Sequence, residues 1–270
     1  MLDIQNITKV FEKGTVNEHI ALKNLSIKLE DGEFVTIVGS NGAGKSTLFN
    51  AICGSFWVDE GHIILDNEDV TYKNEHERAR VIGRVFQDPM RGTAPNMTIE
   101  ENLALAYTRS GRHSSPLSLA VTRKKTEFFR ENLARYNMGI EDRMKTKIGL
   151  LSGGQRQVVT LLMCTLSIPK LLLLDEHTAA LDPATAAKVM EITKTIVNEN
   201  KITTLMITHN LSQSLTTGNR TIMLDGGEII LDIAGKERDS MTKEDLIKMY
   251  SAKRQKDFDN DRILLADEKE

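Results

Sequence analysis

Apolar and polar positions alternate in two stretches near the start of the chain, and this alternation predicts half-buried strands. Leu2 and Ile4 carry the first alternation, and Leu25, Ile27 and Leu29 carry the second. The segment between them reads KVFEKGTVNEH and is a turn-rich connection. We therefore expect an antiparallel sheet to open the fold.

A near-continuous apolar run from Glu33 to Val38 predicts a strand that is buried on both faces. The run ends in the glycine-rich sequence GSNGAG. Residues Lys45 to Cys53 then have a helical pattern, which Gly54 ends. This part of the chain is therefore expected to be a strand, a glycine loop and a helix.

The middle of the chain is expected to be helical. A strand-like segment at Ile63 to Leu65 precedes it, and the helical pattern extends from Pro89 to Ser167. Thr98 and Glu101 have the spacing of a capping box, and Ser110 to Ser118, rich in Ser and Gly, is expected to be a loop between two helices. This region is predicted to be a helical insert.

Strands and helices alternate again after the insert. Leu171 to Leu174 and Ile202 to Ile207 are predicted to be buried parallel strands. The helix between them begins with Asp182 as its N-cap and Pro183 as its first residue. A hairpin around Gly226 and a helix from about Thr242 follow.

These elements predict one domain over residues 1–250. Residues 1–88 and 168–235 form its core with a β subdomain, and residues 89–167 form the helical insert. Residues 251–270 mix both charge signs densely, and we expect a solvated tail there.

Composition narrows the class of protein. The 270 residues are 40% hydrophobic and 27% charged, which is typical of a globular chain. The formal net charge of -3 argues against a general nucleic-acid-coating domain. Cys53 and Cys164 are too isolated for a disulfide framework or a zinc site, so we expect reduced packing thiols.

No apolar run approaches the roughly 18 to 20 residues that a membrane-spanning helix needs. The N-terminal sequence MLDIQNITK has neither a basic segment nor an apolar segment of the kind that begins a secretory signal. A cytosolic location is therefore expected.

The strongest local motif is the glycine loop, which fits G-x-x-x-x-G-K-[ST] and lies between a buried strand and a helix. Its backbone N–H groups and the helix N-terminus are suited to phosphate oxygens, with Lys45 at the β and γ phosphates and Ser46 as a Mg²⁺ ligand. An ordinary glycine-rich turn explains the glycines but not the Lys-Ser pair. The expected nucleotide-binding residues here are Gly39, Ser40, Asn41, Gly42, Ala43, Gly44, Lys45, Ser46 and Thr47.

A second motif, an acidic pair, follows the apolar run at Leu171 to Leu174. Asp175 is expected to hold Mg²⁺, directly or through water, and Glu176 to accept a proton from the attacking water. Strands often end in charged turns, so this pair alone does not indicate a nucleotide site. Together with the glycine loop it does.

Between the two motifs lies LSGGQ, at Leu151 to Gln155, which matches the signature of ATP-binding cassette (ABC) ATPases. Other segments resemble the same family in the same order: Gln87 in VFQDP resembles its Q-loop, Asp182 its D-loop, His209 in ITHN its switch histidine, and Phe11 its adenine-stacking aromatic residue. The resemblance covers roughly residues 2–234. It implies an α/β fold, a P-loop NTPase core with a mainly parallel sheet, an antiparallel β subdomain and an inserted α-helical subdomain.

The resemblance also implies roles. Glu176, His209 and Gln87 are the catalytic candidates, and Ser46, Gln87 and Asp175 are the metal candidates. In the family each ATP is held by the glycine loop of one subunit and the signature of the other. Ser152, Gly153, Gly154, Gln155 and Asp182 would then contact the ATP of a second copy in a head-to-tail dimer, which has C2 symmetry if both subunits are this chain.

Two positions depart from the common family pattern. His177 follows Glu176 where Pro is usual, and Asn210 follows His209 where Asp is usual. Neither change removes a phosphate or metal ligand. The loop after Glu176 loses the restriction of φ that proline imposes, and Asn210 is still suited to capping the following helix.

The function that the resemblance implies is the ATP-hydrolysing, Mg²⁺-dependent subunit of a membrane transporter, held on the cytoplasmic side of the membrane by multi-spanning permease subunits. A single cassette with a helical insert looks most like a bacterial uptake system with an extracytoplasmic solute-binding protein, and LLLLDEHTAALDP and NMTIEENLALA look similar to a branch with amino-acid-like, including aromatic, cargo. The alternative is a soluble cassette ATPase acting on nucleic acid or ribosomes. Its usual forms have tandem cassettes or a long coiled coil, which this chain lacks, and no nucleic-acid partner is expected.

Overall fold

The computed structural model describes residues 1–109 and 121–252. The loop predicted at Ser110 to Ser118 and residues 253–270 of the predicted tail lie outside the described residues. None of the helices in the described ranges has both the length and the apolar character needed to cross a lipid bilayer.

The predicted opening sheet is present. In the described residues it has four antiparallel strands in the order β2-β1-β4-β5. They are β1 (Leu2–Phe11), β2 (His19–Leu29), β4 (Glu60–Leu65) and β5 (Glu68–Asp69). The first two strands are longer than the apolar alternation indicated, because their ends, up to Phe11 and from His19, do not alternate between buried and exposed residues.

A second sheet, six-stranded in the described residues, has the order β10-β9-β3-β8-β7-β6. All neighbouring strands pair in parallel except the β9–β10 hairpin, which is antiparallel as predicted. Its strands are β3 (Phe34–Gly39), β6 (Ile82–Val85), β7 (Leu171–Asp175), β8 (Thr204–Ile207), β9 (Arg220–Asp225) and β10 (Glu228–Ala234). The sequence pattern did not predict the short edge strand β6.

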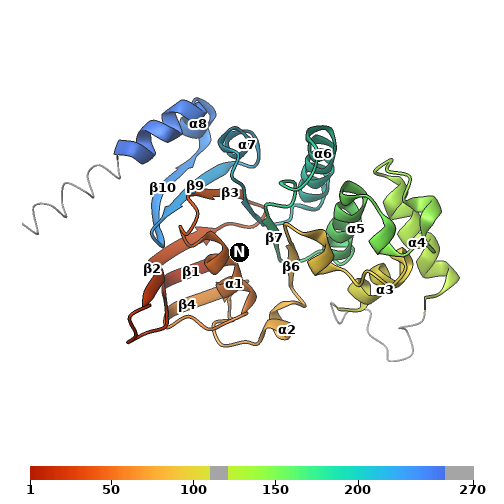
Figure 1. Ribbon diagram of the computed structural model, residues 1–270, viewed down its shortest axis with the longest axis horizontal. Coiled ribbons are helices and arrows are strands. Elements are labelled where there is room, and N and C mark those ends of the chain that lie inside the picture. Colours follow the sequence, from red (N-terminus) through yellow and green to blue (C-terminus); the bar gives the residue numbers. More distant parts are fainter. Residues whose placement is uncertain (110–120, 253–270) are drawn as a thin grey trace, which may run out of the picture.

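The α-helices are α1 (Lys45–Cys53), α2 (Glu75–Arg78), α3 (Ile99–Arg109), α4 (Arg123–Ala134), α5 (Gly153–Thr165), α6 (Pro183–Asn200), α7 (Leu211–Thr216) and α8 (Gly235–Asp239). Short 3₁₀ helices cover Pro89–Gly92, Glu141–Arg143 and Ile148–Leu150, and residues 243–252 are helical, close to the predicted start. The predicted caps are present: Thr98 and Glu101 bond reciprocally, and Asp182 accepts from the Thr185 N–H at 3.0 Å. Helices α3, α4 and α5 form one end of an elongated molecule, and the four-stranded sheet lies toward the other (Figure 1).

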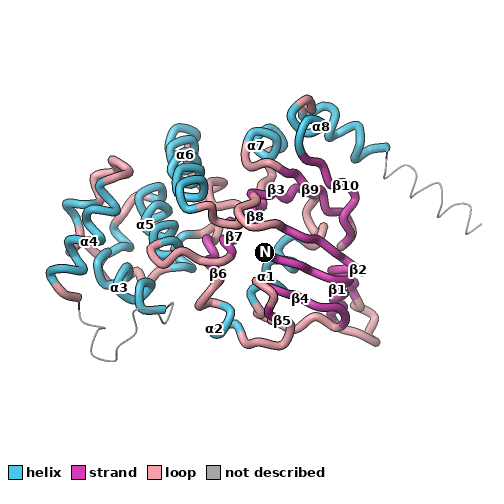
Figure 2. The backbone as a smooth tube through the Cα atoms, turned by 180° about the vertical axis from the view of Figure 1, so that it is seen from behind, coloured by secondary structure: helices cyan, strands magenta, loops and turns pink. Residues whose placement is uncertain are grey.

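Alternating residues of the central strands pack on opposite faces of the six-stranded sheet. Leu171 and Leu173 of β7 belong to a core shared with α1 and the four-stranded sheet, whereas Leu172 and Leu174 belong to a core shared with α5 and α6. Apolar residues of the insert, such as Phe129, are continuous with the second core. Seen from behind, α3, α4 and α5 lie at the end away from the four-stranded sheet, whereas α1, α7 and α8 lie beside the strands (Figure 2).

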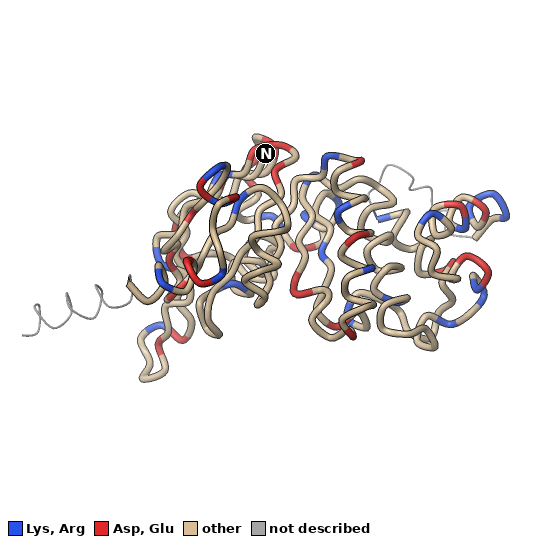
Figure 3. The backbone as a smooth tube through the Cα atoms, turned by 90° about the horizontal axis from the view of Figure 1, so that it is seen from above, with Lys and Arg blue, Asp and Glu red and all other residues tan. Residues whose placement is uncertain are grey.

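The predicted thiols behave as packing groups. Cys53 and Cys164 are both free and buried, in α1 and α5. Burial raises the pKa of both thiols, and the cation of Arg84 acts in the opposite direction on Cys53. Charged residues of both signs are interspersed along the described chain (Figure 3), in keeping with the small net charge.

Candidate functional site

The predicted site residues follow four neighbouring parallel strands at the edge of the sheet where each strand ends. The strands lie in the order β3-β8-β7-β6, and their registers bring these ends level. The glycine loop follows β3, His209 follows β8, Asp175 and Glu176 end and follow β7, and Gln87 follows β6. Open parallel sheets bind ligands at this edge, so the topology brings together motifs that are far apart in the sequence.

The glycine loop folds around the ammonium group of Lys45. This side chain is only 6% exposed, and its Nζ donates to the carbonyl oxygens of Gly39 and Ser40, each at 2.8 Å. Burial lowers the pKa of Lys45, and the nearby carboxylates of Glu176 and Asp175 oppose that shift. The loop thus holds a cation in its centre with backbone oxygens as its partners.

The N-terminus of α1 is open to an anion. Its N-cap is Gly44, and among the described residues no side chain caps this end. Gly44 has a φ of 96°, and a Cβ there would lie 2.6 Å from the carbonyl oxygen of Ala21, so only glycine fits. The unpaired N–H groups and the helix dipole favour a phosphate group at this position.

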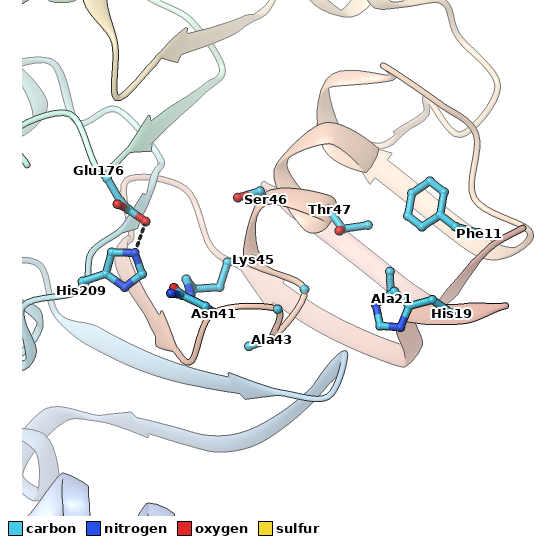
Figure 4. Close-up of a pocket in the computed structure, with 12 residues that line it drawn as sticks. Phe11, His19, Ala21, Asn41, Ala43, Lys45, Ser46, Thr47, Glu176 and His209 are labelled. Carbon is cyan, nitrogen blue, oxygen red and sulfur yellow. Dashed lines mark ion pairs between the residues drawn. The ribbon is translucent and has the colours of Figure 1, made fainter. Parts of the chain in front are cut away.

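A cavity of about 250 Å³ extends along the glycine loop. Glu176 and His209 border it at one end, Phe11 and His19 at the other, and Lys45 lies between them (Figure 4). The ring of Phe11 is partly exposed and packs edge-on against Phe56, with 5.4 Å between ring centroids. The cavity therefore has an aromatic end and a cationic middle, features that suit an adenine nucleotide.

Glu176 and His209 contact each other across the end of this cavity. The distance between Glu176 Oε1 and His209 Nε2 is 2.6 Å (Figure 4). Glu176 has a left-handed backbone with φ of 48°, which is uncommon for a residue with a side chain, and its N–H donates to the Ile207 carbonyl oxygen at 3.1 Å. Such conformations cluster at functional sites, because the surrounding structure must hold them.

A second cavity, of about 820 Å³, lies beside the first. Ser46, Gln87, Asp175 and Glu176 all line it. They contribute a hydroxyl, an amide and two carboxylates, which are the hard oxygen donors that suit Mg²⁺. The candidate metal and catalytic groups therefore face one space from three different segments.

The signature segment does not join either cavity. Ser152 is the N-cap of α5, and its Oγ accepts from the Gln155 N–H at 3.3 Å. Gln155 Oε1 accepts from the Ser152 N–H, and its Nε2 donates to the Met138 carbonyl oxygen at 3.1 Å. The Gln155 side chain thus holds the segment in place, while Ser152 and Gly153 are exposed.

Asp182 and Gly154 connect the signature segment to α6. A Cβ on Gly154 would lie 2.1 Å from Thr185 Cγ2, so glycine permits the close approach of the two helices. Hydrogen bonds from Thr185 lower the pKa of Asp182. Within one chain, Ser152, Gly153, Gly154, Gln155 and Asp182 therefore lie apart from the glycine loop.

The two departures from the family pattern have structural roles. Asn210 caps α7, accepting from the Gln213 N–H at 3.0 Å, as predicted. His177 is buried against α6, with its Nε2 3.0 Å from Thr193 Oγ1. Thr193 Oγ1 already donates to the Val189 carbonyl oxygen, so His177 donates this bond from a neutral ring.

This burial predicts a specific pH dependence of stability. Burial lowers the pKa of His177 to about 4, below its ordinary value. As the pH falls below the ordinary value, the unfolded chain binds the proton first, so stability present near neutral pH is lost between about pH 6.5 and pH 4. The loss from this one group reaches about 2 kcal/mol at about pH 5.

Replacing His177 with Gln removes this titration and keeps a hydrogen-bond donor. In denaturant unfolding at about pH 7 and pH 5, we expect the variant to lose about 2 kcal/mol less stability than the wild type. His76→Gln, at an exposed position, is the control and should behave as the wild type. An equal loss in wild type and His177→Gln would contradict the assignment.

Sequence patterns missed several residues of the site. His19 and Ala21 of β2 line the first cavity, but no sequence motif marked them. Arg84 lines the second cavity and lies 2.8 Å from Asp175. It lies on β6, the strand that the sequence pattern did not predict.

The sequence of the chain matches that of one protein family. The family described as ABC transporter matches residues 22–179. The chain is 45% identical to the tyrosine transport ATP-binding protein of Clostridioides difficile strain R20291, over 93% of this chain and 98% of that protein. It is 33% identical to the phosphonates import ATP-binding protein PhnC of Lactobacillus delbrueckii subsp. bulgaricus, over 89% and 91% of the two chains.

A solved structure has the same fold. It is the dimeric, post-hydrolysis state of the ATP-binding cassette MJ0796 bound to ADP and Pi, with a TM-score of 0.71 and 29% identity. The similarity covers 87% of this chain and 98% of that one. It confirms the predicted α/β P-loop architecture with its two kinds of sheet and its helices.

Proposed function

The chain belongs to the ABC transporter family and is an ATP-hydrolysing subunit of that family, and we propose that it powers a bacterial importer of amino-acid-like cargo. One observation carries the proposal. The glycine loop, the Asp175-Glu176 pair, Gln87 and His209 converge at one edge of the parallel sheet, in the order that a bound nucleotide needs. The two relatives named above are a transport protein and an import protein, which supports the importer over the alternative.

In the proposed binding mode the nucleotide lies along the first cavity. Phe11 would stack on the adenine, and the loop from Gly39 to Thr47 would surround the phosphates. Lys45 would turn its ammonium from the carbonyl oxygens of Gly39 and Ser40 toward the β and γ phosphates, which places the γ-phosphate beside Glu176 and His209.

The oxygen donors of the second cavity fit a magnesium ion. Ser46 and Asp175 would hold it, with Gln87 at the margin of the site. When bound, Mg²⁺ would neutralise negative charge on the phosphates. No group of three or more acidic, histidine or cysteine side chains in residues 1–109 and 121–252 could hold a metal, so phosphate and water oxygens would complete the coordination.

The proposed chemistry assigns proton transfer to Glu176. Its carboxylate would accept the proton of the water that attacks the γ-phosphate, and His209, at 2.6 Å, would orient that carboxylate until nucleotide arrives. His209 is about half exposed and can turn toward the phosphate once it enters. Gln87 follows β6, the strand next to β7, and would position the same water from that side.

We further propose that two copies pair head to tail around two ATP molecules. The signature residues Ser152 and Gly153 are exposed at the start of α5 and do not reach their own glycine loop. A second copy related by a twofold axis would present them to the γ-phosphate of the first. The dimeric state of the similar cassette supports this arrangement.

The remaining partners follow from the transport role. We propose that permease subunits with several membrane spans hold the chain on the cytoplasmic face of the membrane, and that an extracytoplasmic solute-binding protein delivers the cargo. The tyrosine transport relative favours an aromatic amino acid or a similar solute.

Co-purification tests these partners. The tagged full chain should recover multi-spanning membrane proteins from detergent-solubilised membranes, and ATPase activity of the recovered complex in vesicles should rise when solute and binding protein are added. Recovery of ribosomes or nucleic acid in place of membrane proteins would reject the importer and favour the alternative.

Gln87 should couple hydrolysis to transport. It lies between β6 and the helical insert, at the wall of the second cavity. We expect Gln87→Ala to leave ATP binding within about twofold of the wild type, and to reduce transport by the reconstituted complex more than basal hydrolysis. Gln5→Ala, which removes an amide at an exposed position away from the cavity, is the matched control. Unchanged transport by Gln87→Ala would contradict the coupling role.

A further inference from the structure

Arg84 is the one arginine of β6, and its side chain lines the cavity that contains the proposed metal site. The register of the parallel strands places Arg84 opposite Leu173, two residues before Asp175. Its side chain lines the same cavity as Ser46, Gln87 and Asp175. No family motif named above includes this residue.

The guanidinium group of Arg84 forms a fork between two elements. One terminal nitrogen donates to Asn50 Oδ1 of α1 at 2.7 Å. The other donates to Asp175 Oδ2 at 2.8 Å. Arg84 therefore links the helix that follows the glycine loop to the carboxylate that would hold Mg²⁺.

The surroundings of Arg84 keep this fork in place. Its side chain is 13% exposed and that of Asp175 is 15% exposed, so the ion pair is largely shielded from water. The guanidinium carbon lies 4.7 Å from the ring centroid of Phe86 and 6.0 Å from that of Phe49. Its Nε is buried and has no hydrogen-bond partner among the described residues. Within residues 1–109 and 121–252, the cation thus forms an ion pair with one side chain, that of Asp175.

We propose that Arg84 is a positioning residue that holds Asp175 Oδ2 and leaves Oδ1 for the metal. This proposal rests on the proposed function, because it needs Asp175 as a metal-binding group. The fork fixes the rotation of the carboxylate, and the same positive charge reduces the attraction of that carboxylate for a second cation. Arg84 therefore weakens the binding of the metal and, in the same contact, fixes the geometry of the Asp175 carboxylate.

These two effects predict a combination of measurements that misfolding does not produce. Loss of the Arg84 charge should strengthen the contribution of Mg²⁺ to nucleotide binding while it slows turnover. General damage to the site would weaken both. The two effects can be separated by measuring nucleotide affinity with and without the metal.

The experiment compares Arg84→Met with the wild-type full chain, using a non-hydrolysable ATP analogue and calorimetry. The measured quantity is the ratio of the dissociation constant in EDTA to that in Mg²⁺. We expect this ratio to rise about threefold to tenfold in Arg84→Met through tighter binding in Mg²⁺, and kcat to fall about tenfold without a rise in the ATP KM. Arg84→Gln, which keeps a hydrogen-bond donor without the charge, provides the same test if the methionine variant is unstable.

Three controls separate charge from geometry. Arg84→Lys keeps the charge, so the metal ratio should stay within about twofold of the wild type. Asn50→Ala removes only the anchor of the fork, so the ratio should stay while kcat falls severalfold. Arg80→Met removes an arginine at an exposed position that lines neither cavity, and it should change neither quantity.

The outcomes also distinguish this proposal from the proposed function. If the wild type binds the analogue equally well with and without Mg²⁺, the metal site and the Arg84 proposal are both wrong. If the wild type depends on Mg²⁺ but the ratio is unchanged or lower in both Arg84→Met and Arg84→Gln, only the Arg84 proposal is overturned.

Discussion

Replacing Lys45 with Ala should weaken ATP binding by about tenfold to 100-fold and abolish turnover. The ammonium group of Lys45 is the one side-chain cation within the glycine loop, and charge-assisted hydrogen bonds to phosphate contribute about 1.5–3 kcal/mol. The backbone N–H groups and the open N-terminus of α1 remain, so some binding survives. Turnover needs the lost charge at the γ-phosphate as well.

Calorimetry with MgATP and a phosphate-release assay measure these two effects. Lys236→Ala, at an exposed position, is the matched control and should behave as the wild type. Because Lys45 is buried and bonds two carbonyl oxygens, thermal unfolding must show that the variant is folded. A folded Lys45→Ala with wild-type affinity and rate would remove the glycine loop from the site.

The sequence predicted those parts of the fold that local patterns encode. The glycine loop, the start of α1 at Lys45 and the cap at Asp182 follow from residue types that local sterics and hydrogen bonding require. The family motifs added the order of the remaining segments. Parallel pairing of the strands then brings these segments together. The sequence pattern indicates that the strands are buried, but it does not give the register in which they pair.

The missed features depend on contacts between distant segments. Strand β6 has four residues, and its pattern gives no clear alternation, so Arg84 had no expected partner. Its ion pair with Asp175 spans 91 residues. The His177 bond to Thr193 needs the packing of α6 against the loop after β7. Sequence alone showed that His177 replaces a proline, but not that the ring is buried and neutral.

The two segments predicted to bind phosphate also differ in a way that sequence did not reveal. The N-terminus of α1 has no side-chain cap among the described residues, whereas Ser152 and Gln155 cap α5 reciprocally. The first segment therefore leaves its N–H groups for a ligand of its own chain. The signature segment is already held by its own caps and exposes Ser152 and Gly153. This exposure is what the proposed contact with the ATP of a second copy requires.

Replacing Glu176 with Gln should stop hydrolysis and trap a dimer. The substitution keeps the size and hydrogen bonding of the side chain but removes the group that accepts the proton. Loss of a general base reduces rates by about 10²- to 10⁴-fold, and the affinity for ATP should survive because Lys45 and the loop are unchanged. Glu244→Gln, in an exposed position, is the control.

The trapped state follows from the composite site. ATP that is not hydrolysed continues to connect the glycine loop of one copy to Ser152 of the other, so mass action favours the dimer. In gel filtration with light scattering, the variant should have a mass near 30.2 kDa without nucleotide and roughly twice that mass with MgATP.

A second substitution, Ser152→Arg, should return it to a monomer, because a bulky side chain then occupies the exposed surface that meets the partner's ATP. Wild-type hydrolysis by Glu176→Gln would remove Glu176 from the mechanism. An inactive variant that stays monomeric would keep its catalytic role and reject the composite dimer.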